Sequence, residues 1–213
     1  MIDPLIDNLV EDLKPTKSLN LKELLYISFA SLLVILAIVL GTLGLRPDFH
    51  DAMMNGTMIW KTGGFTIALL GALSLTLILS RPENKMTTKV LWPFFIIIAL
   101  LLWRCIDLGL HASIFEELLN LNLDGSAYCL SVVIGGGLFT FGLLWTFWLR
   151  KSASSDTKTL GTMAGLLSGS IASTAYSMHC NMDHIFYVLT CYWLPVIALG
   201  IFGRLVCGKF LKW

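Results

Sequence analysis

The chain has 213 residues, of which 56% are hydrophobic and only 14% are charged. A soluble domain of this length cannot bury so much apolar surface, so the composition favours a membrane protein. The net charge of +1 excludes a strongly basic nucleic-acid-binding protein, and we expect no direct contact with nucleic acid.

Six apolar stretches dominate the chain. A helix that crosses a bilayer needs about 20 apolar residues, and the stretches at 24–45, 63–79, 90–110, 129–149, 160–178 and 185–206 meet or approach that length. The second is the shortest, and the fifth is rich in small residues. The sequence therefore predicts an all-α polytopic protein that lies in a lipid bilayer, with a six-helix transmembrane domain over residues 24–213.

The distribution of Lys and Arg predicts the orientation, because cytoplasmic loops carry an excess of both. Twelve of them lie in the N-terminal segment, in the loops after the second and fourth stretches, and at the C-terminus. The opposite loops hold only Arg46 and Lys61. We therefore expect both termini in the cytoplasm, and a location in the bacterial inner membrane.

Residues 1–23 are expected to form a cytoplasmic segment with a short amphipathic helix. Six apolar residues fall at helical spacing and make one stripe: Ile2, Leu5, Ile6, Leu9, Val10 and Leu13. The polar face carries three acidic residues, Asp7, Glu11 and Asp12. An anionic membrane surface repels such a face, whereas a basic and apolar groove on a protein partner suits it. The alternative is that the segment packs against the cytoplasmic ends of the bundle.

Thiols and imidazoles gather on the non-cytoplasmic side. Cys129 and Cys180 are predicted at the outer ends of two stretches, in a compartment where disulfides form and persist. His179, Cys180, Asp183 and His184 place four candidate metal ligands in one short loop, and a metal site needs three or four that converge. Alternatively, the cysteines are ordinary small apolar residues and the histidines lie at a wet interface.

Two further patterns have structural interpretations. Arg104 and Asp107 lie three residues apart near the end of the third stretch, where they can neutralise each other. In the fifth stretch, small residues recur every fourth position and are expected to allow close helix packing: Gly161, Gly165, Gly169 and Ser173.

Several motifs, in their order and spacing, resemble the NrsF family of membrane anti-sigma factors over nearly the whole chain. They are residues 5–15 (LIDNLVEDLKP), residues 44–48 (GLRPD), Cys129-Leu130, His179-Cys180 with Asp183, Trp193, and the closing Lys212-Trp213. The resemblance implies a regulator rather than an enzyme, with no catalytic residue and no cofactor.

The resemblance also implies how such a regulator works. It implies that the cytoplasmic N-terminal segment holds an extracytoplasmic-function sigma factor at the membrane, through Leu5, Ile6, Asp7, Leu9, Val10, Glu11, Asp12 and Leu13. It further implies that two outer cysteines, matching Cys129 and Cys180, release the sigma factor under metal or oxidative stress. A soft metal ion is one candidate signal.

Two other classes of protein account for parts of the pattern. A small membrane transporter or metal exporter would use the thiols and imidazoles of the outer loop together with Arg104 and Asp107. A membrane thiol oxidoreductase would use the cysteines, but the sequence has no CxxC motif. The ionisable residues cluster at one face, and none lies at mid-membrane to relay a substrate, which favours the regulator.

Overall fold

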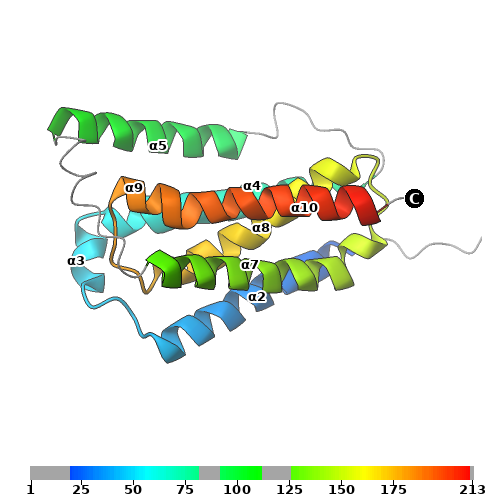
Figure 1. Cartoon of the computed structure of the whole chain (residues 1–213), viewed down its shortest axis with the longest axis horizontal. Coiled ribbons are helices and arrows are strands. Elements are labelled where there is room, and N and C mark those ends of the chain that lie inside the picture. The colour runs from blue at the N-terminus through cyan, green and yellow to red at the C-terminus, as the bar shows by residue number, and fades with distance from the viewer. Residues whose placement is uncertain (1–19, 82–91, 112–125, 212–213) are drawn as a thin grey trace, which may run out of the picture.

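The computed structural model describes residues 20–81, 92–111 and 126–211, and over these residues it is helical with no strand. The long helices lie side by side along the longest axis of the molecule (Figure 1). The elements in chain order are α2 (Leu21–Thr42), α3 (Phe49–Met54), α4 (Thr57–Leu79), α5 (Trp92–His111), α7 (Ser126–Phe147), η2 (Leu149–Lys151), α8 (Thr157–Ser177), α9 (Ile185–Val188), the π-helical η3 (Leu189–Trp193) and α10 (Leu194–Phe210).

The ends of α2 follow from local sequence signals. The side chain of Asn20 accepts a hydrogen bond from the backbone N–H of Lys22 and caps the first turn. Gly44 ends the helix with a left-handed φ of 79°, and its N–H donates to the carbonyl of Leu40. Glycine adopts this conformation without a Cβ penalty, so the chain turns sharply towards α3 at this point.

Helix α8 lies at the centre of the bundle. It packs against α10, α4, α7 and α2, whereas α5 packs at the periphery against α4. Nearly every residue of α8 is buried, and many of them are small or carry a hydroxyl group. Because its neighbours are other helices rather than lipid, α8 needs less apolar surface than a lipid-facing helix.

Glycines bring α8 and α10 into direct backbone contact. A Cβ atom on Gly161 would lie 2.3 Å from the carbonyl oxygen of Gly203, and one on Gly165 would lie 2.1 Å from that of Leu199. No larger residue fits at either position without moving the backbone. The close packing predicted from the spacing of small residues in this helix is therefore confirmed.

Four helical stretches are long and apolar enough to cross a membrane: Leu21–Thr42, Thr57–Leu79, Ser126–Lys151 and Ile185–Phe210. They correspond to the first, second, fourth and sixth predicted stretches. Helices α5 and α8 coincide with the other two, with 20 and 21 residues. The described part of the chain thus confirms an all-helical architecture with four candidate spans. The count of six spans and the orientation stay predictions.

Helix α4 begins six residues before the predicted stretch. The apolar pattern starts at residue 63, whereas the helix starts at Thr57 and includes Lys61 in its second turn. The Lys61 side chain is buried, because oxygen atoms from another part of the chain surround its ammonium group. The charged residue that seemed to precede the apolar stretch in the sequence is therefore part of the helix and is buried in the fold.

Candidate functional site

Two loops meet at one end of the bundle. The turn after α2 lies against the C-terminal end of α8, where the backbone N–H of Arg46 donates to the carbonyl of Met178 over 3.2 Å. Nδ1 of His179 lies 2.9 Å from the carbonyl oxygen of Gly44. A carbonyl only accepts hydrogen bonds, so this nitrogen carries the proton. The two motifs Gly-Leu-Arg-Pro-Asp and His-Cys therefore contact each other in the fold.

Arg46 is the centre of a buried ionic network. Its guanidinium donates to Asp48 through Nε and Nη2, both over 2.8 Å, and to Asp183 through Nη2 over 2.8 Å and Nη1 over 3.3 Å. These hydrogen bonds, first of all that with Asp48, raise the pKa of Arg46 against the opposing effect of burial. The same contact lowers the pKa of the Asp48 carboxyl. Arg46 and Asp48 are therefore both charged at neutral pH.

Lys61 contributes the second buried cation. Its Nζ atom lies 2.8 Å from the carbonyl oxygen of Met182, 3.0 Å from that of Cys180 and 3.1 Å from Oδ1 of Asp183. The side chain is 0% exposed, and it also lies over the ring of Tyr192 at 5.1 Å. An ammonium group has three donors, and each has an acceptor here. The loop from Cys180 to Asp183 is thus held on the first turns of α4.

The two cysteines predicted as sensors lie next to this network. Cys129 is 0% exposed and Cys180 is 6% exposed, and both are free thiols. The Cys129 sulfur lies 3.7 Å from the carbonyl oxygen of Cys191 and within electrostatic range of the Cys180 thiol. In this arrangement the thiols are shielded from water, so a reagent reaches them only when the loop moves. Their role as sensors stays a prediction.

The four candidate metal ligands lie in the same loop, and at least two of them already have partners in the fold. Asp183 binds both Arg46 and Lys61, and Nδ1 of His179 binds Gly44. Among the described residues, no group of three or more His, Cys, Asp or Glu side chains is arranged to hold a metal ion. A metal ion that binds Asp183 must displace the buried cations of Arg46 and Lys61 from it. Metal binding is therefore coupled to movement of the loop.

Sequence reasoning did not identify Arg46 and Lys61 as site residues. Both were counted as exceptions to the charge asymmetry, and Arg46 was also part of the Gly-Leu-Arg-Pro-Asp motif. A signal was nevertheless present, because ionisable residues at a membrane boundary are costly unless they are paired or functional. The nearest acid in the sequence to Arg46 is Asp48, whereas Asp183 is 137 residues away, so only the fold reveals the full network.

Other predicted site residues lie outside the described part of the chain. These are the partner-binding positions of the N-terminal segment, Leu5 to Leu13, and the side chains of Arg104 and Asp107.

The fold and the site define a helical protein with four candidate membrane spans in its described part, in which a buried ionic network at one end of the bundle holds a cysteine-bearing loop. The family model for negative regulators of sigma F matches residues 9–213. The anti-sigma-F factor NrsF of Caulobacter vibrioides is 30% identical over 221 residues, covering 99% of both chains. The chain therefore belongs to this NrsF family of anti-sigma factors, which are regulatory rather than catalytic proteins. No solved structure matches it significantly.

Proposed function

We propose that the protein is an anti-sigma factor of the bacterial inner membrane, with both termini in the cytoplasm. It holds an extracytoplasmic-function sigma factor through residues 1–23 and releases it when metal or oxidative stress reaches the outer face of the bundle. Membership of the family and the four apolar helices support the anchor and the regulatory role. The proposal that the outer loop senses stress is supported mainly by the contact between Lys61 and the backbone of Cys180.

The apolar stripe of the N-terminal segment is proposed to bind the sigma factor. Replacing Leu9 or Leu13 with Glu places an unpaired charge in a buried contact, and burial of a charge without a partner is costly. We expect Leu9→Glu and Leu13→Glu to move the sigma factor from the membrane fraction to the cytosol and to raise transcription of its targets without stress. The polar-face variant Asn8→Glu introduces the same group and serves as the control.

Retention of the sigma factor by Leu9→Glu and Leu13→Glu at normal protein abundance would overturn this assignment. Both substitutions lie outside the predicted membrane-spanning stretches, so the abundance of the variants in the membrane reports insertion separately from binding. Quantitative immunoblots of the membrane and cytosolic fractions measure both quantities in one sample.

Release is proposed to start at Cys129 and Cys180. A hydroperoxide can join their sulfur atoms in a disulfide, with loss of both thiol protons and reduction of the peroxide to water or an alcohol. A soft metal ion can instead bridge the two thiolates, with release of the protons. Either change pulls on a loop that Lys61 and Arg46 hold against α4 and α2. Because α4 packs on the central helix α8, the displacement biases the bundle between two arrangements.

A further inference from the structure

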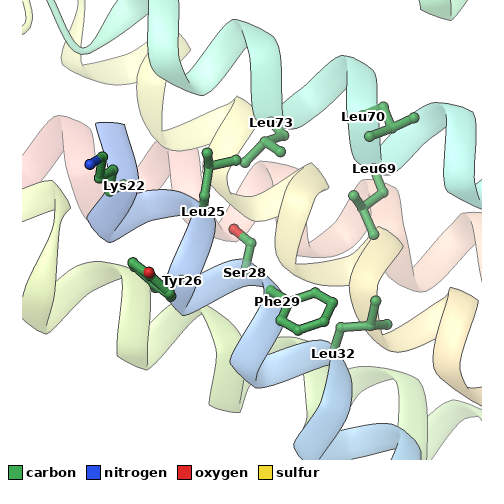
Figure 2. Close-up of a pocket in the computed structure, with 9 residues that line it drawn as sticks. All are labelled: Lys22, Leu25, Tyr26, Ser28, Phe29, Leu32, Leu69, Leu70 and Leu73. Carbon is green, nitrogen blue, oxygen red and sulfur yellow. The ribbon is translucent and has the colours of Figure 1, made fainter. Parts of the chain in front are cut away.

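An apolar groove of about 590 Å³ opens between α2 and α4 (Figure 2). Phe29 and Leu32 of α2 face Leu69 and Leu73 of α4 across it. Both helices pack on α8. Its volume lies within the range of about 300–1,000 Å³ that is typical of small-molecule sites.

Three polar side chains break the apolar lining, those of Lys22, Tyr26 and Ser28, and the hydroxyl of Ser28 lacks a partner among the described residues. The side chain of Ser28 is 6% exposed, and its hydroxyl has no hydrogen-bond partner in the described part of the chain. Figure 2 shows this oxygen pointing from α2 towards α4. Buried hydroxyl groups are nearly always hydrogen-bonded because desolvation without a partner is unfavourable. The groove is therefore suited to a ligand that has a hydrogen-bond acceptor at the level of Ser28.

The second polar group is the ammonium of Lys22, in the first turn of α2. Six residues separate it from Ser28, which corresponds to about 9 Å along a helix. The exposed ring of Tyr26 lies between these two levels. Lysine and tyrosine are typical of the boundary between membrane and water, so the groove begins at the lipid headgroups and runs into the apolar region.

We infer that this groove binds an anionic glycerophospholipid. The phosphate pairs with Lys22, an ester carbonyl accepts the hydrogen bond of Ser28, and an acyl chain follows the wall formed by Phe29, Leu32 and Leu73. The order cation, hydroxyl donor, apolar wall matches the order phosphate, ester, hydrocarbon in such a lipid. This inference is independent of sigma-factor binding and holds for either orientation of the bundle.

The N-terminal segment is a less suitable occupant. Its predicted apolar stripe would suit apolar walls, but the predicted opposite face carries Asp7, Glu11 and Asp12. Leu32 lies ten residues beyond Lys22, which corresponds to about 15 Å into the membrane, and carboxylates are expensive at that depth. A lipid places its only charges at the level of Lys22.

The test uses the full chain, purified in a neutral detergent and titrated with phosphatidylglycerol or phosphatidylcholine, with bound lipid counted by native mass spectrometry. We expect one phosphatidylglycerol per chain to bind about fivefold more tightly than phosphatidylcholine, as one interfacial lysine would provide. Lys22→Gln should abolish that preference. Lys209→Gln, which neutralises an exposed lysine at the end of α10, should leave it unchanged.

Two groove variants test the deeper contacts. Ser28→Ala should weaken binding of both lipids about fivefold, and Leu73→Trp should block it by filling the groove. Leu205→Trp, at an exposed position on α10, controls for the bulk of tryptophan. Equal lipid binding by the parent chain, Lys22→Gln and Ser28→Ala would overturn the inference. Lipid binding that occurs only after deletion of residues 2–13 would also overturn it, and would assign the groove to that segment.

Discussion

The Nζ atom of Lys61 lies 3.0 Å from the backbone carbonyl oxygen of Cys180. This contact joins the predicted sensor cysteine to α4 through the main chain rather than through the thiol. The backbone that carries Cys180 is therefore fixed, and its buried sulfur becomes accessible only when the loop moves. A reaction that moves this backbone must break the hydrogen bond or displace α4, and in both cases the change reaches the bundle.

The first prediction concerns access to the Cys180 thiol. Lys61→Met keeps most of the unbranched side chain but removes the three hydrogen bonds that hold the loop from Cys180 to Asp183. Loss of buried hydrogen bonds to a charged group costs about 1–3 kcal/mol, so the loop should open more often. We expect maleimide to label Cys180 at least about tenfold faster than in the parent chain, as measured by peptide mass spectrometry.

The control for this measurement is Lys151→Met. Lys151 is exposed and lies 3.7 Å from Glu23 in a surface ion pair, which contributes little to stability. Its removal should leave the labelling rate of Cys180 unchanged. Equal rates for Lys61→Met and the parent chain would show that Lys61 does not restrain the loop.

The second prediction concerns stability. Asp183→Asn leaves the buried cations of Arg46 and Lys61 without their shared carboxylate, and breaking a buried ion pair on one side costs about 3–5 kcal/mol. We expect a marked decrease in the thermal unfolding temperature in detergent. Asp51→Asn, which changes an exposed carboxylate on α3, should have almost no effect. An unchanged unfolding temperature for Asp183→Asn would exclude a structural role for the network.

The third prediction concerns the contact between α8 and α10. Gly165→Ala places a Cβ 2.1 Å from the carbonyl oxygen of Leu199, so the two helices must separate, and overpacking of this kind costs about 1–3 kcal/mol. Gly142→Ala is the matched control, because a Cβ there meets no atom within 4 Å. It should stabilise α7 by about 0.5–1 kcal/mol. Opposite shifts of the two unfolding temperatures are expected, and a stabilised Gly165→Ala would contradict the described packing.

The fourth prediction concerns topology. Reporter fusions after Lys85 and Lys158 should have cytoplasmic activity, and fusions at Asn55 and Asn120 should have periplasmic activity. The reason is the excess of Lys and Arg in the first pair of loops. This arrangement requires α5 and α8 to cross the membrane in addition to the four candidate spans. If the reporters before and after α5, or before and after α8, had activity in the same compartment, that helix would not cross the membrane and the number of spans would be smaller.

The helices could be predicted from the sequence because length and hydropathy are local properties. The glycine spacing likewise indicated the face of α8 that approaches another helix, since i and i+4 positions lie on one face. The network was not predictable, because Lys61 and Asp183 are 122 residues apart. Nothing local indicates which loops meet, or that Lys61 and Asp183 are buried partners. The groove between α2 and α4 was missed for the same reason, since its walls come from different helices.

The π-helical turn in the last span also lies beyond local prediction. It interrupts the run from α9 to α10 at Leu189–Trp193 and contains Cys191, whose carbonyl oxygen accepts from the Cys129 thiol. Such turns are single irregularities that occur frequently at functional sites. Here the turn places the last span beside the cysteine pair, which connects the candidate site to a third helix.

We propose that stress acts through Cys129 and Cys180 to release a sigma factor. The most direct measurement is the fraction of sigma factor that stays in the membrane after graded exposure to a hydroperoxide or to cadmium. The comparison is between the parent chain, the double variant Cys129→Ser/Cys180→Ser, and Cys207→Ser, which alters a buried thiol on α10 away from the site. We predict that the parent chain and Cys207→Ser release the sigma factor at the same dose, and that the double variant retains it. Release from the double variant at the dose that acts on the parent chain would contradict the account.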